Sequence, residues 1–296
     1  NTAARHGGGI QNQGTLTITN SSISENTASS FFGGGINNNT ILSIAQTTLR
    51  SNQAAVAGGA IYNGGGTLAL ANSTLETNNA SQQGGAIYSQ GNYTIADSTF
   101  RQNSTAGDGG GLFALNSNGT IQRTLFSGNH ATIWGGGIGI WEGNATVSNS
   151  HLFENSAGDG GGLALNDRSD FNAGTTVKLY STLVQSNTAT ASGGGIFNYG
   201  GYFYLYDSWL AHNRAASGGG ISSLYTVNAA GDIYLTSALY SYSTIFYNNR
   251  ALSGRGGALY STGYMEVENS FFQGNRAVQS GGAIAKDSST NYPTSA

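Results

Sequence analysis

The sequence has no cysteine, a single proline (Pro293) and little charge, with Asp, Glu, Lys and Arg making up 8% of its 296 residues. The lack of cysteine excludes a disulfide framework and a thiolate metal site. A single proline excludes a collagen triple helix, and the scarcity of Glu, Lys and Arg excludes a coiled coil. No apolar run approaches the ~20 residues of a membrane-spanning helix.

Basic residues are also few. The chain carries 11 Lys plus Arg against 14 Asp plus Glu, a formal net charge of −3. The basic residues stand singly along the chain, so the sequence predicts no nucleic-acid partner. Residues 1–9 contain neither an initial Met nor the apolar stretch of a signal peptide. We therefore expect a mature protein or an excised segment.

Glycine, by contrast, is abundant, at 47 residues. A Gly-Gly pair followed by Gly or Ala and then by Ile or Leu recurs at intervals of 25 or 26 residues, with two longer intervals of 33 and 38. A period in this range is typical of a solenoid, and the longer intervals predict insertions near residues 164–176 and 222–238. The clusters begin at Gly7, Gly33, Gly58, Gly84, Gly109, Gly135, Gly160, Gly193, Gly218, Gly256 and Gly281.

Each interval between glycine clusters also holds an apolar anchor residue with an asparagine three positions later. In a stack of coils about 4.8 Å apart, each asparagine amide donates to the carbonyl of the next, so the column forms a ladder. Asparagine also tolerates the left-handed backbone that a corner needs. A looser column three residues before the anchor, from Asn20 to Asn269, predicts a solvated turn. The predicted structural ladder is Asn26, Asn52, Asn78, Asn103, Asn129, Asn155, Asn187, Asn213, Asn249 and Asn275.

Between each glycine cluster and this motif lies a stretch in which polar and apolar residues alternate, such as 15–19 and 202–206. This period predicts a strand with one buried face. We expect two or three short strands in each repeat, with the glycines at positive φ where the chain turns sharply. The predicted fold is all-β: a single right-handed parallel β-helix of about eleven coils, forming one domain over residues 1–296. Neither end shows a capping element, which predicts open strand edges.

Candidate catalytic groups are few, since the histidines fall in different columns and no Ser-His-Asp arrangement can be assembled. The sharpest constellation places Asp108 and Asp159 two coils apart, about 9.6 Å, with Trp134 between them. That separation is near the upper limit for an inverting glycosidase pair, about 6.5–9.5 Å, and Glu142 and Trp141 lie close enough in the repeat to join it. Alternatively, both carboxylates belong to polar turns before the glycine clusters, where Asp is common.

The first insertion contains a polar run with the oxygen ligands that Ca²⁺ prefers. A loop rich in turn-forming residues explains the same composition, and the spacing matches no known calcium loop. We therefore expect neither a metal nor a cofactor. The run is Asn166, Asp167, Arg168, Ser169 and Asp170.

The outward positions of the alternating strands change character halfway along the chain. Small Ser, Thr and Ala residues occupy most of them in the first six repeats, whereas 13 of the 16 tyrosines lie from Tyr180 onward. Exposed aromatic rows mark binding surfaces, because Tyr supplies contact area and a polar tip at low entropic cost. Stacking across coils to stabilise the sheet is the alternative. The predicted partner-binding residues are Tyr180, Tyr202, Tyr204, Tyr206, Tyr240 and Tyr242.

The pairing of the two motifs, as in Phe100-Arg101-Gln102-Asn103 followed by Gly109-Gly110-Gly111-Leu112, resembles the repeat of the chlamydial polymorphic outer membrane proteins and related bacterial β-helix surface proteins. The resemblance spans nearly the whole chain. It implies a secreted or surface-exposed β-helix, commonly the passenger of an autotransporter, that acts in adhesion. The chain departs from the family pattern in that many anchors are Ile, Leu or Val in place of Phe.

The sequence thus favours a non-enzymatic protein of the extracellular space or the outer cell surface, with a structural or adhesive role. Its expected partners are other copies of itself, through open ends or side faces, or a protein or glycan on a host or neighbouring cell. The alternative is a lyase or hydrolase that acts on polysaccharides from a β-helix scaffold. That analogy predicts clustered acids and bases on one face.

Overall fold

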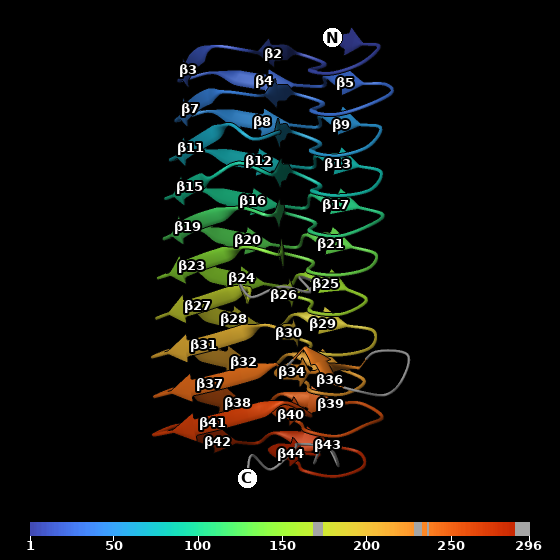
Figure 1. The fold of residues 1–296 in the computed structure, drawn as a ribbon, viewed down its shortest axis with the longest axis vertical. Helices are drawn as coiled ribbons and strands as arrows, with labels where there is room; N and C mark the ends of the chain where they lie inside the picture. The colour runs from blue at the N-terminus through green and yellow to red at the C-terminus, as the bar shows by residue number, and fades with distance from the viewer. Residues whose placement is uncertain (168–173, 228–232, 236, 288–296) are drawn as a thin grey trace.

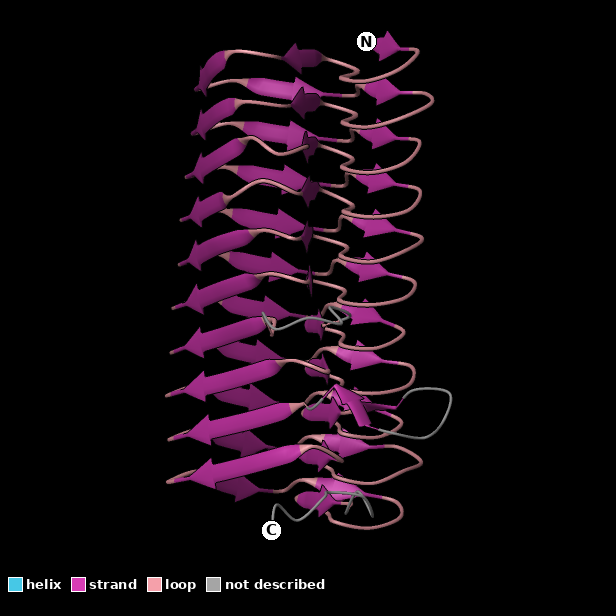
Figure 2. Ribbon diagram, in the orientation of Figure 1, coloured by secondary structure: helices cyan, strands magenta, loops and turns pink. Residues whose placement is uncertain are grey.

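The computed structural model describes residues 1–167, 174–227, 233–235 and 237–287. The described chain runs as a coil whose turns stack along one axis, with the N-terminal turn at one end and the C-terminal turn at the other (Figure 1). Its regular elements are all strands, and no helix occurs among the described residues (Figure 2). Four parallel sheets, here named A to D, run along the axis. The predicted all-β parallel solenoid is confirmed, with about ten turns, and its handedness stays a prediction.

A typical coil contributes one strand to each sheet, so it holds four strands. The expectation of two or three strands is therefore wrong. The strands of sheet A have only two residues each, as in β5 (Thr27–Ala28), and so short an element shows no alternating pattern in the sequence.

Sheet A follows directly after the ladder asparagines. Each strand has an outward residue followed by a small inward one, such as Ala28 or Ala80, both fully buried. Its strands, in spatial order, are β1 (Thr2–Ala3), β5 (Thr27–Ala28), β9 (Gln53–Ala54), β13 (Asn79–Ala80), β17 (Ser104–Thr105), β21 (His130–Ala131), β25 (Ser156–Ala157), β29 (Thr188–Ala189), β33 (Arg214–Ala215), β39 (Arg250–Ala251) and β43 (Arg276–Ala277).

Sheet B begins at the Ile or Leu that follows each glycine cluster. This residue packs into the core, where Ile36 and Ile61 are fully buried. Its strands are β2 (Ile10–Asn12), β6 (Ile36–Asn38), β10 (Ile61–Asn63), β14 (Ile87–Ser89), β18 (Leu112–Leu115), β22 (Ile138–Trp141), β26 (Leu163–Asn166), β30 (Ile196–Tyr199), β34 (Ile221–Leu224), β40 (Leu259–Ser261) and β44 (Ile284–Lys286).

Sheet C holds the alternating stretches that the sequence predicts as strands. In β31, Phe203 and Leu205 are fully buried and the three tyrosines that alternate with them point outward. Its strands are β3 (Thr15–Thr19), β7 (Ile41–Ala45), β11 (Thr67–Ala71), β15 (Tyr93–Ala96), β19 (Asn118–Gln122), β23 (Asn144–Ser148), β27 (Thr176–Tyr180), β31 (Tyr202–Tyr206), β37 (Ala238–Tyr242) and β41 (Tyr264–Glu268).

Sheet D is centred on the apolar anchors, which stack on one another inside the solenoid. The rings of Phe100 and Phe126, for example, lie 4.5 Å apart between centroids. Its strands are β4 (Ser22–Ser24), β8 (Thr48–Arg50), β12 (Thr74–Glu76), β16 (Thr99–Arg101), β20 (Leu125–Ser127), β24 (His151–Phe153), β28 (Leu183–Gln185), β32 (Trp209–Ala211), β38 (Ile245–Tyr247) and β42 (Phe271–Gln273). Outside these sheets, β35 (Thr226–Val227) and β36 (Ile233–Leu235) pair antiparallel.

Three corners of the coil use positive φ. The first glycine of every cluster has φ between +60° and +69°, as predicted. The exposed residue three before each anchor has φ between +45° and +50°, which makes the predicted solvated turn between sheets C and D. The third corner corrects the sequence analysis, because the left-handed residue is the one before the ladder asparagine, such as Glu25 or Gln102. The asparagines themselves stay outside the positive-φ region.

The second glycine of each cluster is required for a different reason, the close approach of backbones. A Cβ on Gly110 would lie 2.3 Å from the carbonyl oxygen of Gly136 in the next coil. Any side chain there would push neighbouring coils apart. The Gly excess thus serves both a turn and a contact between coils.

Candidate functional site

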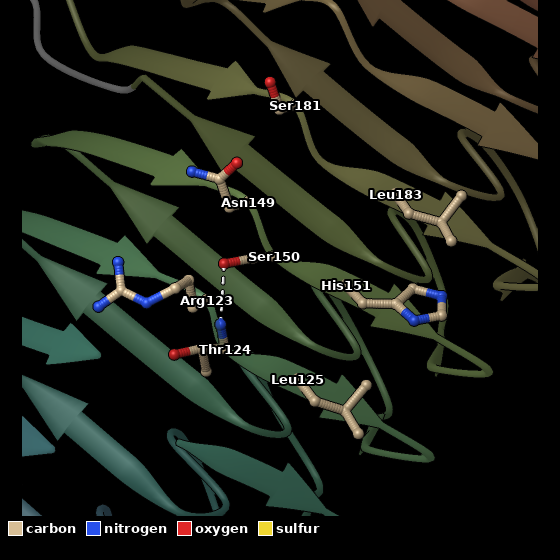
Figure 3. Close-up of a pocket in the computed structure, with 8 residues that line it drawn as sticks. All are labelled: Arg123, Thr124, Leu125, Asn149, Ser150, His151, Ser181 and Leu183. Carbon is tan, nitrogen blue, oxygen red and sulfur yellow. Dashed lines mark hydrogen bonds between the residues drawn. The ribbon is translucent and has the colours of Figure 1, made fainter. Parts of the chain in front are cut away.

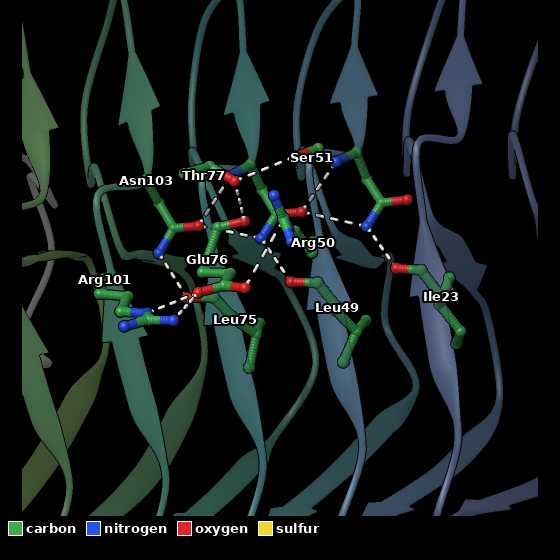
Figure 4. Close-up of polar contacts among 11 residues, drawn as sticks. Ile23, Leu49, Arg50, Ser51, Leu75, Glu76, Thr77, Arg101 and Asn103 are labelled. Carbon is green, nitrogen blue, oxygen red and sulfur yellow. Dashed lines mark hydrogen bonds and ion pairs between the residues drawn. The ribbon is translucent and has the colours of Figure 1, made fainter.

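The ladder asparagines form one continuous hydrogen-bonded column between sheets D and A. Each Nδ2 donates to the Oδ1 of the asparagine in the next coil over 2.9–3.1 Å. From Asn52 onward it also donates to the anchor carbonyl of the preceding coil, as Asn103 does to Leu75 (Figure 4). Each Oδ1 also accepts the backbone N–H of the preceding ladder asparagine, as Asn129 accepts from Asn103. These amides therefore have no hydrogen-bonding capacity left for a ligand.

Two parts of this framework were not predicted from the sequence. Asn1 extends the ladder by one step, because its Nδ2 donates to Oδ1 of Asn26 over 2.8 Å. A second column lies two residues before the anchor, where backbone N–H groups donate to hydroxyls of the next coil, as Thr47 does to Ser73 over 3.1 Å. Its signal in the sequence is a Ser or Thr in all ten repeats: Ser21, Thr47, Ser73, Ser98, Thr124, Ser150, Thr182, Ser208, Thr244 and Ser270.

The two turn carboxylates tie neighbouring coils together. Oδ1 of Asp108 accepts the backbone N–H of Trp134 over 3.1 Å, and Oδ1 of Asp159 accepts that of Ser192 over 2.7 Å. Burial raises the pKa of Asp159, and the hydrogen bonds from Ser192 and Trp134 oppose that rise. The geometry therefore gives both carboxylates a turn-stabilising contact. Trp134 packs its ring 5.6 Å from that of Trp141.

In the part of the chain that the structure describes, no group of three or more His, Cys, Asp or Glu side chains is placed to hold a metal ion. In the polar run of the first insertion, Asp167 is buried and its Oδ2 accepts the backbone N–H of Thr175 over 2.9 Å. Residues 168–170 of that run lie outside the described residues.

A groove of about 540 Å³ follows the corner between sheets C and D over three coils (Figure 3). Arg123 at one end is held by two hydrogen bonds to Asp97, of 2.6 and 2.7 Å. Burial lowers the pKa of His151. The groove thus combines a polar corner with an apolar wall. Its lining residues are Arg123, Thr124, Leu125, Asn149, Ser150, His151, Ser181 and Leu183.

The predicted tyrosines lie together on the outer face of sheet C. Tyr180, Tyr206 and Tyr242 form one column, with ring centroids 4.8 and 5.3 Å apart. Tyr204 and Tyr240 form the second, 4.6 Å apart and within 5° of parallel. The strand register pairs Tyr204 with Tyr240 and Tyr206 with Tyr242, so the alignment across the second insertion holds.

Charged and polar groups border these tyrosine columns. Lys178 Nζ lies 5.6 Å from the ring centroid of Tyr204, a cation–π contact at one end. At the other end Glu266 accepts hydrogen bonds from the hydroxyls of Tyr242 and Tyr264, each 2.8 Å long. The hydrogen bond to Glu266 raises the pKa of Tyr242 to about 12. Tyr202 lies beside the columns and is 38% exposed.

An apolar stripe that the sequence analysis missed runs along the outer face of sheet D. It comprises the residues just before the anchors in the last six strands, which are direct neighbours across the sheet. Its C-terminal members are the most exposed, with Phe271 at 56% and Trp209 at 48%. The same column is Ser or Thr in the first four strands. The stripe is Leu125, Leu183, Trp209, Ile245 and Phe271, with one polar member, His151.

Three arginines that stand singly in the sequence stack in space, which corrects the expectation of scattered basic residues. Arg214, Arg250 and Arg276 are direct neighbours in β33, β39 and β43, and all three are exposed. Two unit charges about 5 Å apart in water repel by roughly 1 kcal/mol. The sequence signal is the triplet Asn-Arg-Ala, which the last three ladder positions share.

Three segments of the chain match a known family of repeats. The model of the Chlamydia polymorphic membrane protein (Chlamydia_PMP) repeat matches residues 97–115, 123–140 and 243–262. Three segments of the chain are thus similar to this repeat. The resemblance seen in the sequence is therefore confirmed. Each matched segment begins at the exposed corner before sheet D and runs through sheets A and B, so the tyrosine-bearing strands of sheet C lie outside the repeat matches.

The other two comparisons add nothing further: no curated protein and no solved structure matched the chain. Across the described residues, no helix has the length and apolar character needed to cross a membrane.

Proposed function

We propose that the chain is a non-enzymatic, surface-exposed β-solenoid that acts in adhesion, with the tyrosine columns of sheet C as its contact surface. One observation carries the proposal: the outer face of sheet C changes from small residues to stacked tyrosines over neighbouring coils of an otherwise regular rod. The Chlamydia polymorphic membrane protein repeat supports a location at the outer membrane or cell surface. The partner is a protein or glycan on another cell.

The stacked arrangement suits contact with a macromolecule. Rings that lie parallel, such as Tyr204 and Tyr240, cover one another's faces, so the surface offers ring edges and hydroxyl groups. The rings are already ordered by their neighbours, so binding costs little further side-chain entropy. Tyr also combines apolar area with a hydrogen-bonding tip, which suits both protein and glycan partners.

The contacts of the turn carboxylates favour the non-enzymatic proposal over the polysaccharide-degrading alternative. Asp108 and Asp159 each accept a backbone N–H from the next coil, a structural task that explains their position before the glycine clusters. A glycan-degradation screen tests the point. Turnover by the wild-type chain that is lost on Asp108→Asn with Asp159→Asn would replace the adhesive proposal with an enzymatic one.

The adhesion proposal is tested by coating beads with the chain and counting those that bind a cultured epithelial monolayer. Tyr204→Ala with Tyr206→Ala is expected to reduce binding about tenfold while leaving the melting temperature within about 5 °C. The matched control, Thr120→Ala with Gln122→Ala, changes the same two columns of sheet C in the N-terminal half. It is expected to bind like wild type. Unaltered binding with a large loss of melting temperature would show that the tyrosines only stabilise the sheet.

The apolar stripe supports a second role, weak self-association through this side face. The stripe spans six strands of sheet D that lie about 4.8 Å apart, and each strand presents two outward residues about 7 Å apart. The outer face over these strands therefore has an area of roughly 400 Å² per chain. This is about half the area of a standard interface per partner, so a dimer has a dissociation constant of about 10 µM or weaker. Two rods that pair side by side in the same direction would bring Arg50 and Arg101 of one chain against Arg50 and Arg101 of the other. Two rods that run in opposite directions can overlap through their uncharged stripes alone.

Sedimentation of the full chain over a concentration series tests this role. Trp209→Lys is expected to abolish the dimer, and Thr74→Lys, in the same column but outside the overlap, is expected to keep it. Because the chain has no cysteine, a mixture of the Leu125→Cys and Phe271→Cys variants shows, by the disulfides that form, how the two chains of the dimer are oriented. Antiparallel pairing predicts disulfides between the two variants. A wild-type chain that stays monomeric at millimolar concentration would contradict the role.

A further inference from the structure

A basic row occupies the outer face of sheet A in its last three coils. The outward column of this sheet is uncharged from Thr2 to Thr188, apart from His130. It then continues as Arg214, Arg250 and Arg276, whose Cα atoms are paired in register. All three arginines are exposed, on a chain whose formal net charge is −3.

The basic row differs in its pairing from four other arginines of the molecule. The ion pairs among the described residues involve Arg50 and Arg101 with Glu76, Arg123 with Asp97, and Arg255 with Asp287. In the first two of these groups, neighbouring coils place opposite charges in one column, as Figure 4 shows for Arg50, Glu76 and Arg101. In the basic row, three like charges stack at the strand spacing, which leaves guanidinium groups with donors directed to solvent.

We propose that the basic row binds a linear sulfated polysaccharide. Guanidinium groups make paired, charge-assisted hydrogen bonds to planar or tetrahedral oxyanions. A row with one charge about every 4.8 Å fits a polymer that carries an anionic group on successive sugars along its length. The rigid stacking of β33, β39 and β43 holds the three charges in line before the polymer arrives, so little ordering accompanies binding.

Other polyanions fit the basic row less well. Nucleic-acid-binding surfaces spread basic residues over a wide patch on a positively charged domain, whereas this chain has a single row and a negative net charge. Anionic membranes are held by clusters of about four to eight basic residues, more than the row provides. The basic row lies on a different sheet from the tyrosine columns, so this inference is independent of the proposed adhesive partner.

The experiment measures binding of a heparin-derived oligosaccharide to the full chain by calorimetry at pH 7.5. Wild type is expected to bind, with affinity falling about tenfold or more between 50 and 200 mM NaCl, because binding releases counterions. Arg214→Gln with Arg250→Gln and Arg276→Gln is expected to lose at least tenfold in affinity. The charge-matched control, Arg50→Gln with Arg101→Gln and Arg123→Gln, is expected to bind like wild type.

Each contrary result overturns the proposal. Absence of wild-type binding, or an equal loss in the charge-matched control, would show that the basic row is no specific site. Equal or tighter binding of single-stranded DNA or of phosphatidylserine vesicles would assign the row to another class of polyanion. Melting curves show whether each variant is folded, and Arg250→Gln alone provides a second variant. The Tyr204→Ala, Tyr206→Ala chain is expected to bind the oligosaccharide unchanged, which separates this site from the adhesive surface.

Discussion

At the scale of single residues, stability depends on side chains that use every hydrogen-bonding group they have. Asn129 donates to Asn155 and to the carbonyl of Phe100, and its Oδ1 accepts twice from Asn103. The sequence was sufficient to predict this ladder, because a residue that recurs at a fixed place in every coil must meet its own copies. It was not sufficient to locate the left-handed corner, since Glu25 and Gln102 share no residue type that marks such a backbone.

Replacing a central ladder residue therefore leaves several buried groups unpaired. Asn129→Ala is expected to cost about 3 kcal/mol or more, because each unsatisfied buried group costs about 1–3 kcal/mol. That corresponds to a melting temperature about 6 °C or more below wild type by circular dichroism. Asn118→Ala, which removes an exposed amide from sheet C, is the control and is expected to change the melting temperature by less than about 2 °C. Equal losses of melting temperature in the two variants would show that a ladder asparagine contributes no more to stability than an exposed one.

At the scale of elements, the turn before sheet B needs space as well as a special backbone angle. Gly110→Ala places a Cβ 2.3 Å from a carbonyl oxygen of the next coil, so we expect a chain that fails to fold or melts at least 10 °C lower. Gly14→Ala is the matched control, because a Cβ there meets no atom within 4 Å. It is expected to be neutral or to stabilise by about 0.4–1 kcal/mol. A well-folded Gly110→Ala chain with wild-type melting would contradict the predicted close packing.

The same turn gives a prediction for pH. Burial raises the pKa of Asp159 in the folded chain above its unfolded value, so its charged form opposes folding. The resulting loss of stability grows as pH rises through the folded pKa. Asp159→Asn keeps an oxygen to accept the Ser192 N–H and removes the charge. Its melting temperature is expected to equal or exceed that of wild type at pH 7, with the difference shrinking toward pH 3. A variant that melts lower at pH 7 would contradict this assignment.

Elements also show where sequence reasoning stops. The strands of sheet C were predictable because each alternates over four or five residues, as in Tyr202–Tyr206. The two-residue strands of sheet A and the apolar stripe of sheet D were not, because they become visible only once coils are placed in register. The basic row is the clearest case: Arg214 and Arg250 are 36 residues apart in the sequence and adjacent in space.

At the scale of the whole molecule, the two halves of the rod differ. The N-terminal half carries mostly small residues on sheet C and charged or hydroxyl residues on sheet D. The C-terminal half carries the tyrosine columns, most of the apolar stripe and the basic row on three different sheets. The regular scaffold thus holds these three outer columns toward its C-terminal end, where neighbouring coils repeat each feature. We expect this C-terminal half to make the contacts of the protein.

Tethering the chain to beads through one end at a time shows which half of the rod makes contact. Because the chain has no cysteine, Gln13→Cys or Gln279→Cys provides a single attachment point at an exposed residue of the first or the last coil. Beads coupled through position 13 present the C-terminal half outward and are expected to bind an epithelial monolayer at least tenfold better than beads coupled through position 279. Equal binding from both tethers, or better binding from the C-terminal tether, would contradict the account.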